Sequence, residues 1–343
     1  MNQIFAVVLS YKRKELLKQC LEAIAAQTRP CDAIIVVDNA SNDGTEEMLL
    51  ELGLPKLKVY VLSENTGASG GFNAGFRIAY QSGADFVWMM DDDVIPQPDA
   101  LEKLLQADDK LAELGEPRSF LVSNAYTEAG TLTNVPSVDD RTNGIDYEYW
   151  PRLVEFGLVP VRRATFVSIL MPRATLQRYG LPIAPMFMWG DDTEFTLRIT
   201  EREPGYLVAA SKVLHLRRIS GTINIRRETN PARVPLHRHF VRNEVYVFRR
   251  FYKKRRLLGL MFSRVILLTR LLRDRELNKA KIVLIGLLES LRFTPSPESA
   301  DAPLETLGVT ARLLGARQPE TVPLVTPVET ALPTPTQHLA GVP

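Results

Sequence analysis

Residues 86–94 have the sequence Phe86-Val-Trp-Met-Met-Asp91-Asp92-Asp93-Val94, in which five apolar side chains run directly into three aspartates. This pattern predicts a buried β-strand that delivers carboxylates to its own C-terminal end. Three adjacent anions repel one another and resist burial unless a cation neutralises them, and oxygen ligands favour Mg²⁺ or Mn²⁺. A surface turn that caps a helix from Pro98 is the alternative. The triplet alone leaves both interpretations open.

The composition is that of a globular protein. The chain has 343 residues, 45% of them hydrophobic, which is enough for one large core or two smaller ones. Its two cysteines, Cys20 and Cys31, fit neither a metal-site spacing nor a disulfide framework, which indicates a reducing compartment. The N-terminal residues resemble a first strand more than a signal peptide. We therefore expect a cytoplasmic protein.

Upstream of the triplet, short β-branched runs alternate with amphipathic segments. Strands are predicted at 4–9, 33–37, 58–62 and 85–90, and helices at 13–27, 43–52 and 71–82. This order predicts a Rossmann-like α/β half whose mostly parallel sheet is flanked by helices. Ligands of such sheets bind outside the carboxyl ends of the strands. The predicted strand ends are all polar: Ser10-Tyr11, Asp38-Asn39, Glu64-Asn65 and Asp91-Asp92-Asp93.

The middle of the chain is less regular. Strands are predicted at 119–125, 159–161 and 165–171, followed by a helix that begins near Asp191 with acids in its first turn. A further strand at 205–210 leads toward His215. We interpret residues 1–115 as a nucleotide-sugar-binding half and 116–234 as an acceptor half of one catalytic domain.

The C-terminal third differs in charge and composition. Residues 217–256 carry thirteen basic and two acidic side chains, and residues 235–293 have helical periodicity. The apolar run 257–272 is too short and too charged to span a bilayer, so it is expected to lie at an interface. Docking on an anionic membrane through 242–272 is favoured over a solvated helix face or a nucleic-acid surface. Residues 294–343, rich in proline, are predicted to be a disordered tail.

A glycine-rich segment, Asn65-Thr-Gly67-Ala-Ser-Gly70-Gly71-Phe-Asn73-Ala-Gly75, follows the third predicted strand and opens a helix. Glycines allow a backbone to approach a diphosphate, and a helix N-terminus offers amide donors. The spacing differs from the dinucleotide fingerprint and follows a different strand. For the segment alone, a glycine-rich helix entry without a ligand is the favoured interpretation.

Taken together, the segments resemble glycosyltransferase family 2, inverting sugar-nucleotide transferases with the GT-A fold. The resemblance covers roughly residues 3–250 and narrows toward bacterial galactofuranosyl- and rhamnosyltransferases of cell-envelope glycans. Gly67 to Phe72, Trp88 to Asp93, and Trp189 look most like the galactofuranosyl type, whereas Gly190 replaces a bulkier or acidic residue. The matching motifs, in order, are Val8–Tyr11, Val36–Thr45, Asn65–Gly75, Asp91–Asp93 and Asp191–Phe195.

The resemblance implies a donor site and a metal site. The metal, Mn²⁺ or Mg²⁺, would be held by Asp91 and Asp93, which strand alternation places on one side, while Asp92 faces the sugar or its supporting residues. His215 matches the position of a third ligand, although a satisfied core or surface histidine is the alternative. The other residues expected to contact or shape the donor pocket are Ser10, Tyr11, Asp38, Asn65, Gly67, Gly71 and Asn73.

On the acceptor side, Asp192 is the predicted general base. Two adjacent acids cannot both ionise freely when buried, so either Asp191 or Asp192 should have a raised pKa suited to base chemistry. Glu194 is a candidate to hold an acceptor hydroxyl, and Trp189 to offer an apolar face to a sugar ring. The alternatives are acids that serve the helix dipole and a tryptophan that packs in the core.

The resulting hypothesis is an inverting, metal-dependent transferase that moves galactofuranose from UDP-galactofuranose to a lipid-linked or cell-envelope glycan. It would act as a peripheral protein on the inner face of the plasma membrane, without a nucleic-acid partner and with its oligomeric state open. Rhamnosyl transfer from dTDP-rhamnose is the alternative within the family. A non-catalytic module that binds a nucleotide sugar or scaffolds a membrane is the alternative from another class.

Overall fold

The structure is a computed structural model that describes residues 2–216 and 223–315. Within these residues, twelve strands form one mixed sheet. Ten of them follow the order β12-β3-β2-β1-β4-β10-β6-β11-β9-β8, while β5 pairs with β11 and β7 with β6. The strands are β1 Ile4–Ser10, β2 Ala33–Asp38, β3 Leu57–Leu62, β4 Phe86–Asp91, β5 Val94–Pro96, β6 Phe120–Tyr126, β7 Leu132–Thr133, β8 Ser137–Val138, β9 Leu158–Arg163, β10 Ile169–Pro172, β11 Gly205–His215 and β12 Ala311–Leu313.

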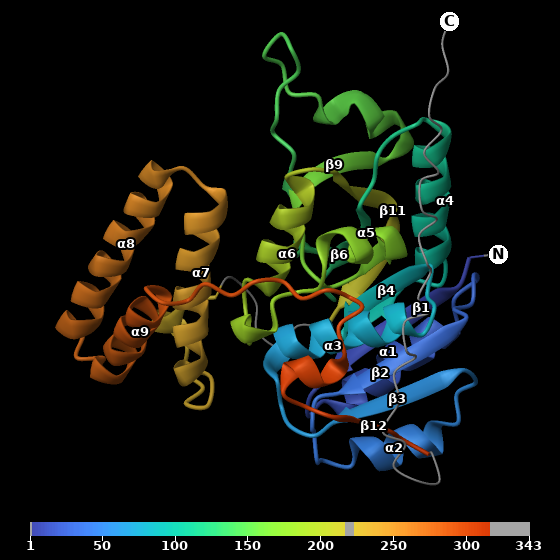
Figure 1. The fold of residues 1–343 in the computed structure, drawn as a ribbon, viewed down its shortest axis with the longest axis horizontal. Helices are drawn as coiled ribbons and strands as arrows, with labels where there is room; N and C mark the ends of the chain where they lie inside the picture. Colours follow the sequence, from blue (N-terminus) through green and yellow to red (C-terminus); the bar gives the residue numbers. More distant parts are fainter. Residues whose placement is uncertain (1, 217–222, 316–343) are drawn as a thin grey trace, which may run out of the picture.

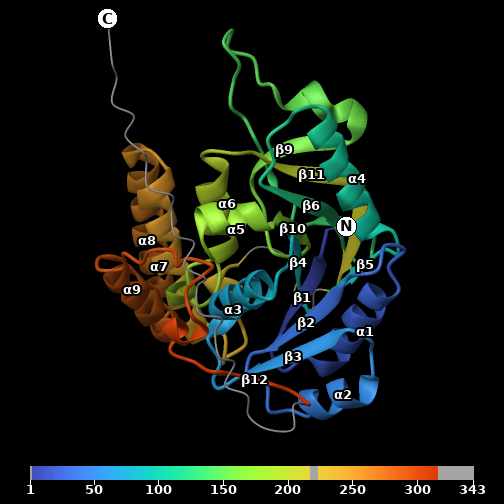
Figure 2. The same ribbon diagram turned by 45° about the vertical axis from the view of Figure 1, so that its right-hand side comes forward.

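Strands β1 to β4 are mutually parallel, as the alternating pattern predicts. Helices cover both faces of the sheet (Figures 1 and 2), so the strands are buried on both sides and their sequences are almost continuously apolar. The buried core on one face includes side chains of α1, α2 and α4, and that on the other face includes α3, α5 and α6. These helices are α1 Lys14–Ala25, α2 Thr45–Leu52, α3 Gly67–Gln81, α4 Ala100–Glu113, α5 Arg173–Tyr179 and α6 Asp191–Thr200.

The second half of the sheet adds antiparallel neighbours. β10 pairs antiparallel with both β4 and β6, and β11 runs parallel to β6 with a register shift between Val208 and Lys212. The predicted strand 165–171 is shorter than expected, because β10 starts only at Ile169. Phe166 precedes it in a loop and packs edge-on against Phe72 of α3. Its apolar character therefore reflects core packing rather than strand formation.

The C-terminal helices form a separate cluster beside the sheet (Figure 1). They share a small apolar core, and Leu197 of α6 contributes to a second one with Val247 of α7. Among the described residues, no helix is both long and apolar enough to cross a membrane. The helices are α7 His237–Phe251, α8 Lys254–Arg273 and α9 Leu277–Ser290.

The prediction that the chain is disordered from residue 294 is wrong for residues 294–315, which we call the C-terminal strap. The strap returns from α9 to the first half of the sheet, where β12 pairs antiparallel with the edge strand β3. The fully buried Arg77 of α3 bonds Glu298 at 2.9 Å and the carbonyl oxygen of Ala302 at 2.8 Å. Backbone pairing and this buried cation hold a segment whose proline content suggested disorder. Residues 316–343 of the predicted tail lie outside the described part of the chain.

Candidate active site

The parallel strands bring their polar C-terminal residues to one edge of the sheet. Ser10 at the end of β1 is in register with Asp38 at the end of β2, and Leu9 is in register with Asp91 at the end of β4. The central strands are buried and apolar, so their first polar side chains meet where the sheet ends. The fold therefore brings these strand-end residues together at one edge of the sheet, as the sequence predicted.

Asp91, Asp93 and His215 form one cluster, in which one possible ligand atom of each residue lies within 4.8 Å of the others. Asp91 ends β4, a turn carries Asp92 and Asp93, and β5 starts at Val94. Because β5 pairs antiparallel with β11, His215 lies opposite Val94 and next to the turn. The predicted residues come together, but through a turn and a strand pair rather than through alternation along one strand.

The cluster fits a divalent cation. Asp93 Oδ1 is buried, accepts no hydrogen bond and lies 3.1 Å from His215 Nε2. Burial raises the pKa of Asp91 well above its ordinary value, and the charges of Asp93 and Asp92 raise it further. A bound cation would relieve this repulsion, and two carboxylates with one imidazole are suitable ligands for Mn²⁺ or Mg²⁺.

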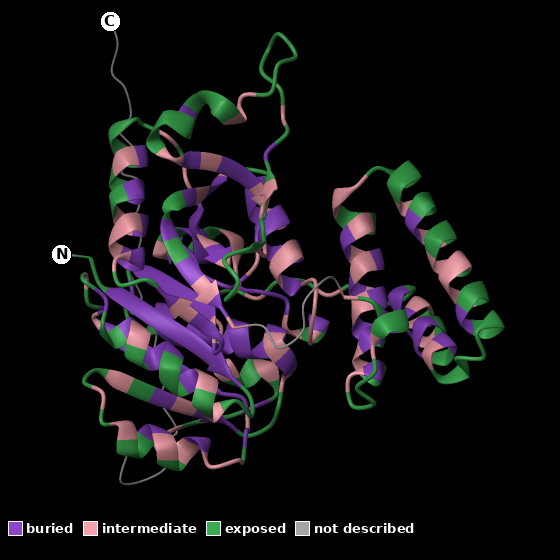
Figure 3. Cartoon of the chain, turned by 180° about the vertical axis from the view of Figure 1, so that it is seen from behind, coloured by how far each residue is buried: buried purple, intermediate pink, exposed green. Residues whose placement is uncertain are grey.

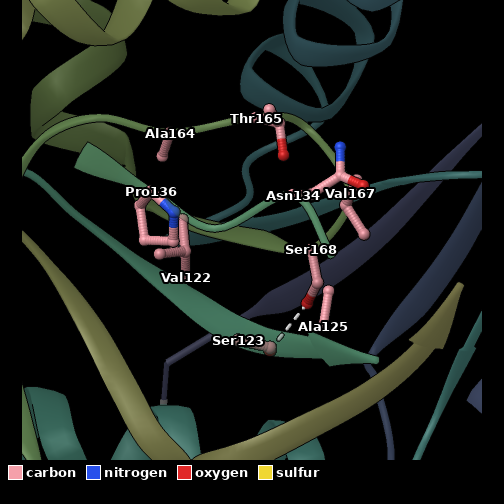
Figure 4. A pocket seen from close by; sticks show the side chains of 9 residues that line it. All are labelled: Val122, Ser123, Ala125, Asn134, Pro136, Ala164, Thr165, Val167 and Ser168. Carbon is pink, nitrogen blue, oxygen red and sulfur yellow. Dashed lines mark hydrogen bonds between the residues drawn. The ribbon is translucent and has the colours of Figure 1, made fainter. Parts of the chain in front are cut away.

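Asn134, in the loop between β7 and β8, is a site residue that the sequence analysis missed. Its Oδ1 lies 3.0 Å from His215 Nδ1. An amide oxygen facing Nδ1 favours the tautomer with the proton on Nδ1, which would leave the Nε2 lone pair for a cation bound between His215 and Asp93. Figure 4 shows Asn134 over a small pocket on β6, with Ser168 and Ser123 hydrogen-bonded below it. No spacing in the sequence links Asn134 to His215, so only the fold reveals this contact.

Asp92 points away from the cluster. It accepts hydrogen bonds from Ser10 Oγ at 2.9 Å and Arg13 Nη1 at 3.2 Å, and burial raises its pKa to about 6. Arg13, which the sequence analysis also missed, contacts Asp93 as well, at 2.8 Å. Ser10 is therefore engaged with Asp92. Arg13 places a half-exposed positive charge between the triplet and the end of β1.

Asp38 has the features of a ligand-binding carboxylate. It is 1% exposed, its Oδ1 accepts hydrogen bonds from the Ser41 amide and hydroxyl, and its Oδ2 has no partner. Burial raises its pKa. A buried unpaired carboxylate oxygen is costly unless a ligand donates to it. Tyr11, at the same edge, is 39% exposed and free to contact a ligand.

The glycine-rich segment contains one loop-forming part and one packing part. Asn65 Oδ1 accepts from the Gly67 amide at 2.8 Å and shapes the entry to α3, where Gly67 has φ +71°. Gly71 instead lies against Leu9, where a Cβ would be 2.3 Å from Cδ1. Asn73 is fully buried and donates to the carbonyl oxygen of Pro182 at 2.8 Å. We therefore assign Gly71 and Asn73 to helix packing rather than to the donor pocket.

Asp191 and Asp192 begin α6 and have raised pKa values, as the adjacency of two acids predicts. Burial and then the charge of Asp192 raise the pKa of Asp191 to about 7, and its Oδ2 has no hydrogen-bond partner. Burial raises the pKa of Asp192, whose side chain is only half-buried and accepts from the Thr193 amide at 2.6 Å. The charge of Asp191 also contributes to the raised pKa of Asp91.

Two acceptor-side candidates have structural partners. Glu194 is 1% exposed and forms two hydrogen bonds with Arg198, at 2.9 and 3.0 Å, so it is not available to hold an acceptor hydroxyl. This corrects the expectation for Glu194. Trp189 is half-buried, and its ring centroid lies 5.0 Å from that of His237, at the N-terminus of α7. The indole is thus partly covered by the helical cluster.

Comparison with known proteins shows which proteins the chain resembles. Residues 5–127 match the model of Glycosyl transferase family 2. The chain is 32% identical over 213 residues to galactofuranosyltransferase GlfT1 of Mycobacterium tuberculosis (strain ATCC 25618 / H37Rv), covering 58% of this chain and 64% of that protein. It is 27% identical over 209 residues to GlfT1 of Mycolicibacterium smegmatis, covering 57% and 65%. The match thus spans a little under two thirds of these relatives.

A solved structure, that of GalNAc-T7 with UDP, GalNAc and Mn2+, is similar with a TM-score of 0.53 at 13% sequence identity, covering 73% of this chain and 48% of that chain. At this identity the likeness concerns the fold. The family match and the fold agree with the order of strands and with the acidic cluster at the end of β4. Residues 5–127 are therefore similar to glycosyltransferases of family 2, and the whole sheet has the GT-A fold.

Proposed function

We propose that the chain is an inverting, metal-dependent galactofuranosyltransferase that uses UDP-galactofuranose. One observation carries the chemistry: Asp91, Asp93 and His215 form a cluster suited to a divalent cation at the end of β4, and the charge of Asp191 at the start of α6 contributes to the raised pKa of Asp91. The choice of sugar is supported by the two galactofuranosyltransferases at 32% and 27% identity. Both arguments are needed, because the cluster alone does not select a sugar.

In the proposed reaction, one set of residues acts on the leaving diphosphate and another residue acts on the attacking hydroxyl. Asp91, Asp93 and His215 would hold the divalent cation, which supplies positive charge to the departing nucleoside diphosphate. Asp192 takes the proton from the acceptor hydroxyl. The hydroxyl oxygen forms its bond to the anomeric carbon from the side opposite the diphosphate, and the electron pair of the broken bond leaves with the diphosphate. Attack from the opposite side inverts the anomeric centre.

Asp192 is preferred over Asp191 as the base because of accessibility. The Asp191 side chain is 4% exposed, whereas that of Asp192 is only half-buried and can reach an acceptor that enters from solvent. The neighbouring buried acid and its own partial burial favour a base that is a better proton acceptor than an ordinary aspartate.

The nucleotide is assigned to the ends of β1 and β2. The unpaired Oδ2 of Asp38 suits the N–H of a pyrimidine base, and the exposed ring of Tyr11 lies at the same edge. Arg13 places a cation beside the carboxylate triplet, where a diphosphate would carry negative charge. These contacts suit a uridine or a thymidine diphosphate and select neither the base nor the sugar, so the choice of UDP-galactofuranose rests on the relatives.

A donor screen tests this assignment. The purified chain, with and without Mn²⁺, is titrated calorimetrically with UDP, UDP-galactofuranose and dTDP-rhamnose. We expect UDP and UDP-galactofuranose to bind, with affinity that falls at least tenfold without Mn²⁺ and in Asp93→Asn. Preferential binding of dTDP-rhamnose would replace the proposed donor. Equal affinity for UDP with and without Mn²⁺, and in the parent and Asp93→Asn, would contradict the metal site.

We also propose that the helical cluster docks on an anionic membrane, where a lipid-linked acceptor would be reached. Much of the outward side of α8 and parts of α9 are exposed (Figure 3), and residues 253–256 place four exposed basic side chains at the start of α8. Basic residues near an anionic surface contribute about 1 kcal/mol each. The exposed apolar side chains are Leu258, Phe262, Val265 and Leu272 on α8, Leu277, Leu284 and Leu288 on α9, and Leu291 directly after it.

Cosedimentation with vesicles tests the docking. We expect binding to vesicles that contain phosphatidylglycerol, weak binding to pure phosphatidylcholine, and about a tenfold loss when Leu258 and Phe262 are both changed to Gln. Ile145→Gln is the matched control, because Ile145 is 74% exposed on a different loop. Equal binding to neutral and anionic vesicles would contradict the electrostatic part of the proposal.

A further inference from the structure

We propose that Asn243 of α7 is a positioning residue for sugar transfer, because it fixes the backbone of residues 185–190, which we call the acceptor loop. The inference rests on the proposed function and adds a role for the C-terminal helices in the chemistry. The loop leads directly into Asp191 and Asp192 at the start of α6. A residue that fixes the loop therefore fixes the direction from which the proposed base meets the acceptor.

The contacts of Asn243 converge on the loop. The side chain is fully buried, and its Nδ2 lies 2.8 Å from the carbonyl oxygen of Met186, 3.1 Å from that of Met188 and 2.8 Å from that of Trp189. Arg242 Nε donates to Asn243 Oδ1 at 3.1 Å, which sets the amide so that Nδ2 faces the loop. The two N–H groups of one amide thus lie within hydrogen-bond distance of three backbone carbonyl oxygens in four residues, and one N–H is shared between two of them.

Arg242 reinforces the same contact. Its Nη2 donates to the carbonyl oxygens of Pro185 at 2.7 Å and Met186 at 3.1 Å. Its guanidinium also lies 3.9 Å from the ring centroid of Phe293, which restricts its position. Two consecutive residues of α7 therefore supply the donors for the carbonyl groups along the acceptor loop.

The loop needs such support because its backbone is strained. Phe187 has φ 65° and Trp189 has φ 63°, which are uncommon conformations for large L-residues, and Gly190 follows at φ 90°. Strain of this kind persists only where the surroundings enforce it, and it concentrates at functional sites. Without the Asn243 donors, the loop would relax toward ordinary backbone conformations and carry the start of α6 with it.

The loop also contacts the donor side. The Ser69 amide, in the first turn of α3, donates to the Phe187 carbonyl oxygen at 3.0 Å. That oxygen lies so close to Gly67 that a Cβ there would be 2.1 Å from it. The acceptor loop is therefore held from two sides, by α7 through Asn243 and by the glycine-rich segment. A shift of the loop would therefore change the position of the proposed base, Asp192, relative to the donor pocket.

Substitution of Asn243 tests the inference with two independent readouts. In Asn243→Ala we expect faster hydrogen exchange at the amides of residues 186–190, and at least a tenfold lower rate of transfer from saturating UDP-galactofuranose. UDP binding in the presence of Mn²⁺ should change less than twofold, because the donor contacts lie on other elements. Asn243→Asp, which keeps the shape but removes the donors, should behave in the same way and serves if the alanine variant does not fold.

Val245→Ala is the matched control. Val245 is a buried residue of α7, two positions from Asn243, and its truncation weakens helix packing without removing a loop hydrogen bond. We expect its transfer rate and its exchange at 186–190 to stay within twofold of the parent. Unchanged exchange at 186–190 in both Asn243 variants, or an equal effect of Val245→Ala, would overturn the positioning role. If the parent protein transferred no sugar, the proposed function would fail, while the exchange measurement would still decide whether Asn243 holds the loop.

Discussion

At the scale of single residues, the site depends on side chains that orient others. Asn134 contacts the Nδ1 side of His215, Arg13 bridges Asp92 and Asp93, and Asn243 holds the loop before Asp191. None of these three would bind the cation or take the proton itself. They instead position, or alter the charge around, the residues that would bind the cation or take the proton.

The orientation of His215 leads to a prediction about metal affinity. In Asn134→Ala the ring loses the partner of Nδ1, so the tautomer that presents Nε2 to Asp93 is no longer favoured. Removal of such an outer partner typically lowers metal affinity about 10- to 100-fold. Titration with Mn²⁺, followed by electron paramagnetic resonance of the free ion, measures the change.

A nearby exposed residue provides the control for that prediction. Leu132 lies two positions before Asn134 and is 50% exposed, so Leu132→Ala should leave Mn²⁺ affinity unchanged. An Asn134→Ala protein with the affinity of the parent would show that His215 is oriented by something else or does not bind the metal.

Asp191 gives a prediction about pH. Its pKa is about 7 in the folded chain and about 4 in an unfolded one, so the folded state holds the proton more tightly. Stability therefore falls as pH rises from about 4 through 7, and Asp191→Asn, which is neutral throughout, avoids this loss. We expect the difference in unfolding free energy between the variant and the parent to shift in favour of the variant by about 1–3 kcal/mol between pH 4 and pH 8. Thermal unfolding at both pH values measures the gap, and a gap that shrinks with rising pH would refute the assignment.

Sequence patterns predicted the site residues that have strong local signals. Asp91, Asp93 and His215 lie where an apolar strand ends or where a family motif places them, and the fold brings them together. Asn134 and Asn243 carry no such signal, because an isolated asparagine has many roles and its partners are distant in sequence. The sequence alone did not exclude Glu194 as an acceptor-binding residue. An ion pair with Arg198, one helical turn away, leaves an exposed carboxylate accessible, and only the structure shows that this pair is buried.

At the scale of elements, the glycine-rich segment and the acceptor loop are coupled by one close approach. Gly67→Ala would place a Cβ 2.1 Å from the Phe187 carbonyl oxygen and also strain a backbone at φ +71°. We expect a loss of stability of about 3 kcal/mol or more, together with weaker UDP binding. Chemical denaturation and calorimetry measure the two effects.

Gly83 separates backbone strain from the clash. It has φ +92°, and a Cβ added there would meet no atom within 4 Å, so Gly83→Ala carries the strain alone, about 1 kcal/mol. Equal losses in the two variants would mean that the contact between Gly67 and Phe187 is not important for stability.

The C-terminal strap makes a second prediction at this scale. Arg77 is fully buried and its partner Glu298 belongs to the strap, so Arg77→Met should destabilise the chain by about 2–4 kcal/mol through the loss of several buried hydrogen bonds. A double-mutant cycle with Glu298→Gln should give a coupling of about 1–3 kcal/mol in urea unfolding.

The exposed pair between Arg312 of the strap and Glu46 is the control for this cycle. Their side chains are 49% and 31% exposed, so their coupling should be about 1 kcal/mol or less. A buried pair that couples no more strongly than this exposed pair would show that the strap is held by β12 pairing rather than by Arg77.

Element boundaries were predictable where periodicity was strong, as in β1 to β4. The strap was mispredicted for a physical reason: its prolines and few aromatics are typical of disordered tails. What orders it is a partner far away in sequence, namely the open edge of β3 and the cation of Arg77. Local composition carries no information about an unpaired strand edge elsewhere in the chain.

At the scale of the whole molecule, the chain joins a GT-A sheet to a helical cluster through contacts on both sides of the proposed site. Asn243 reaches from α7 to the acceptor loop, and the strap returns from α9 to α3 and β3. The helices that we propose to dock on a membrane are therefore mechanically linked to the base. Membrane attachment and acceptor orientation would then be set by the same part of the structure.

The most direct test of the central claim is transfer itself. The parent chain and Asp192→Asn are incubated with UDP-galactofuranose, Mn²⁺ and a synthetic galactofuranoside acceptor, and the products are analysed by mass spectrometry and NMR. We predict that the parent forms a product one hexose longer, with inverted anomeric configuration and only in the presence of Mn²⁺, and that Asp192→Asn is at least about 100-fold slower. A product with retained configuration, transfer without a divalent cation, or an Asp192→Asn protein as active as the parent would contradict the account.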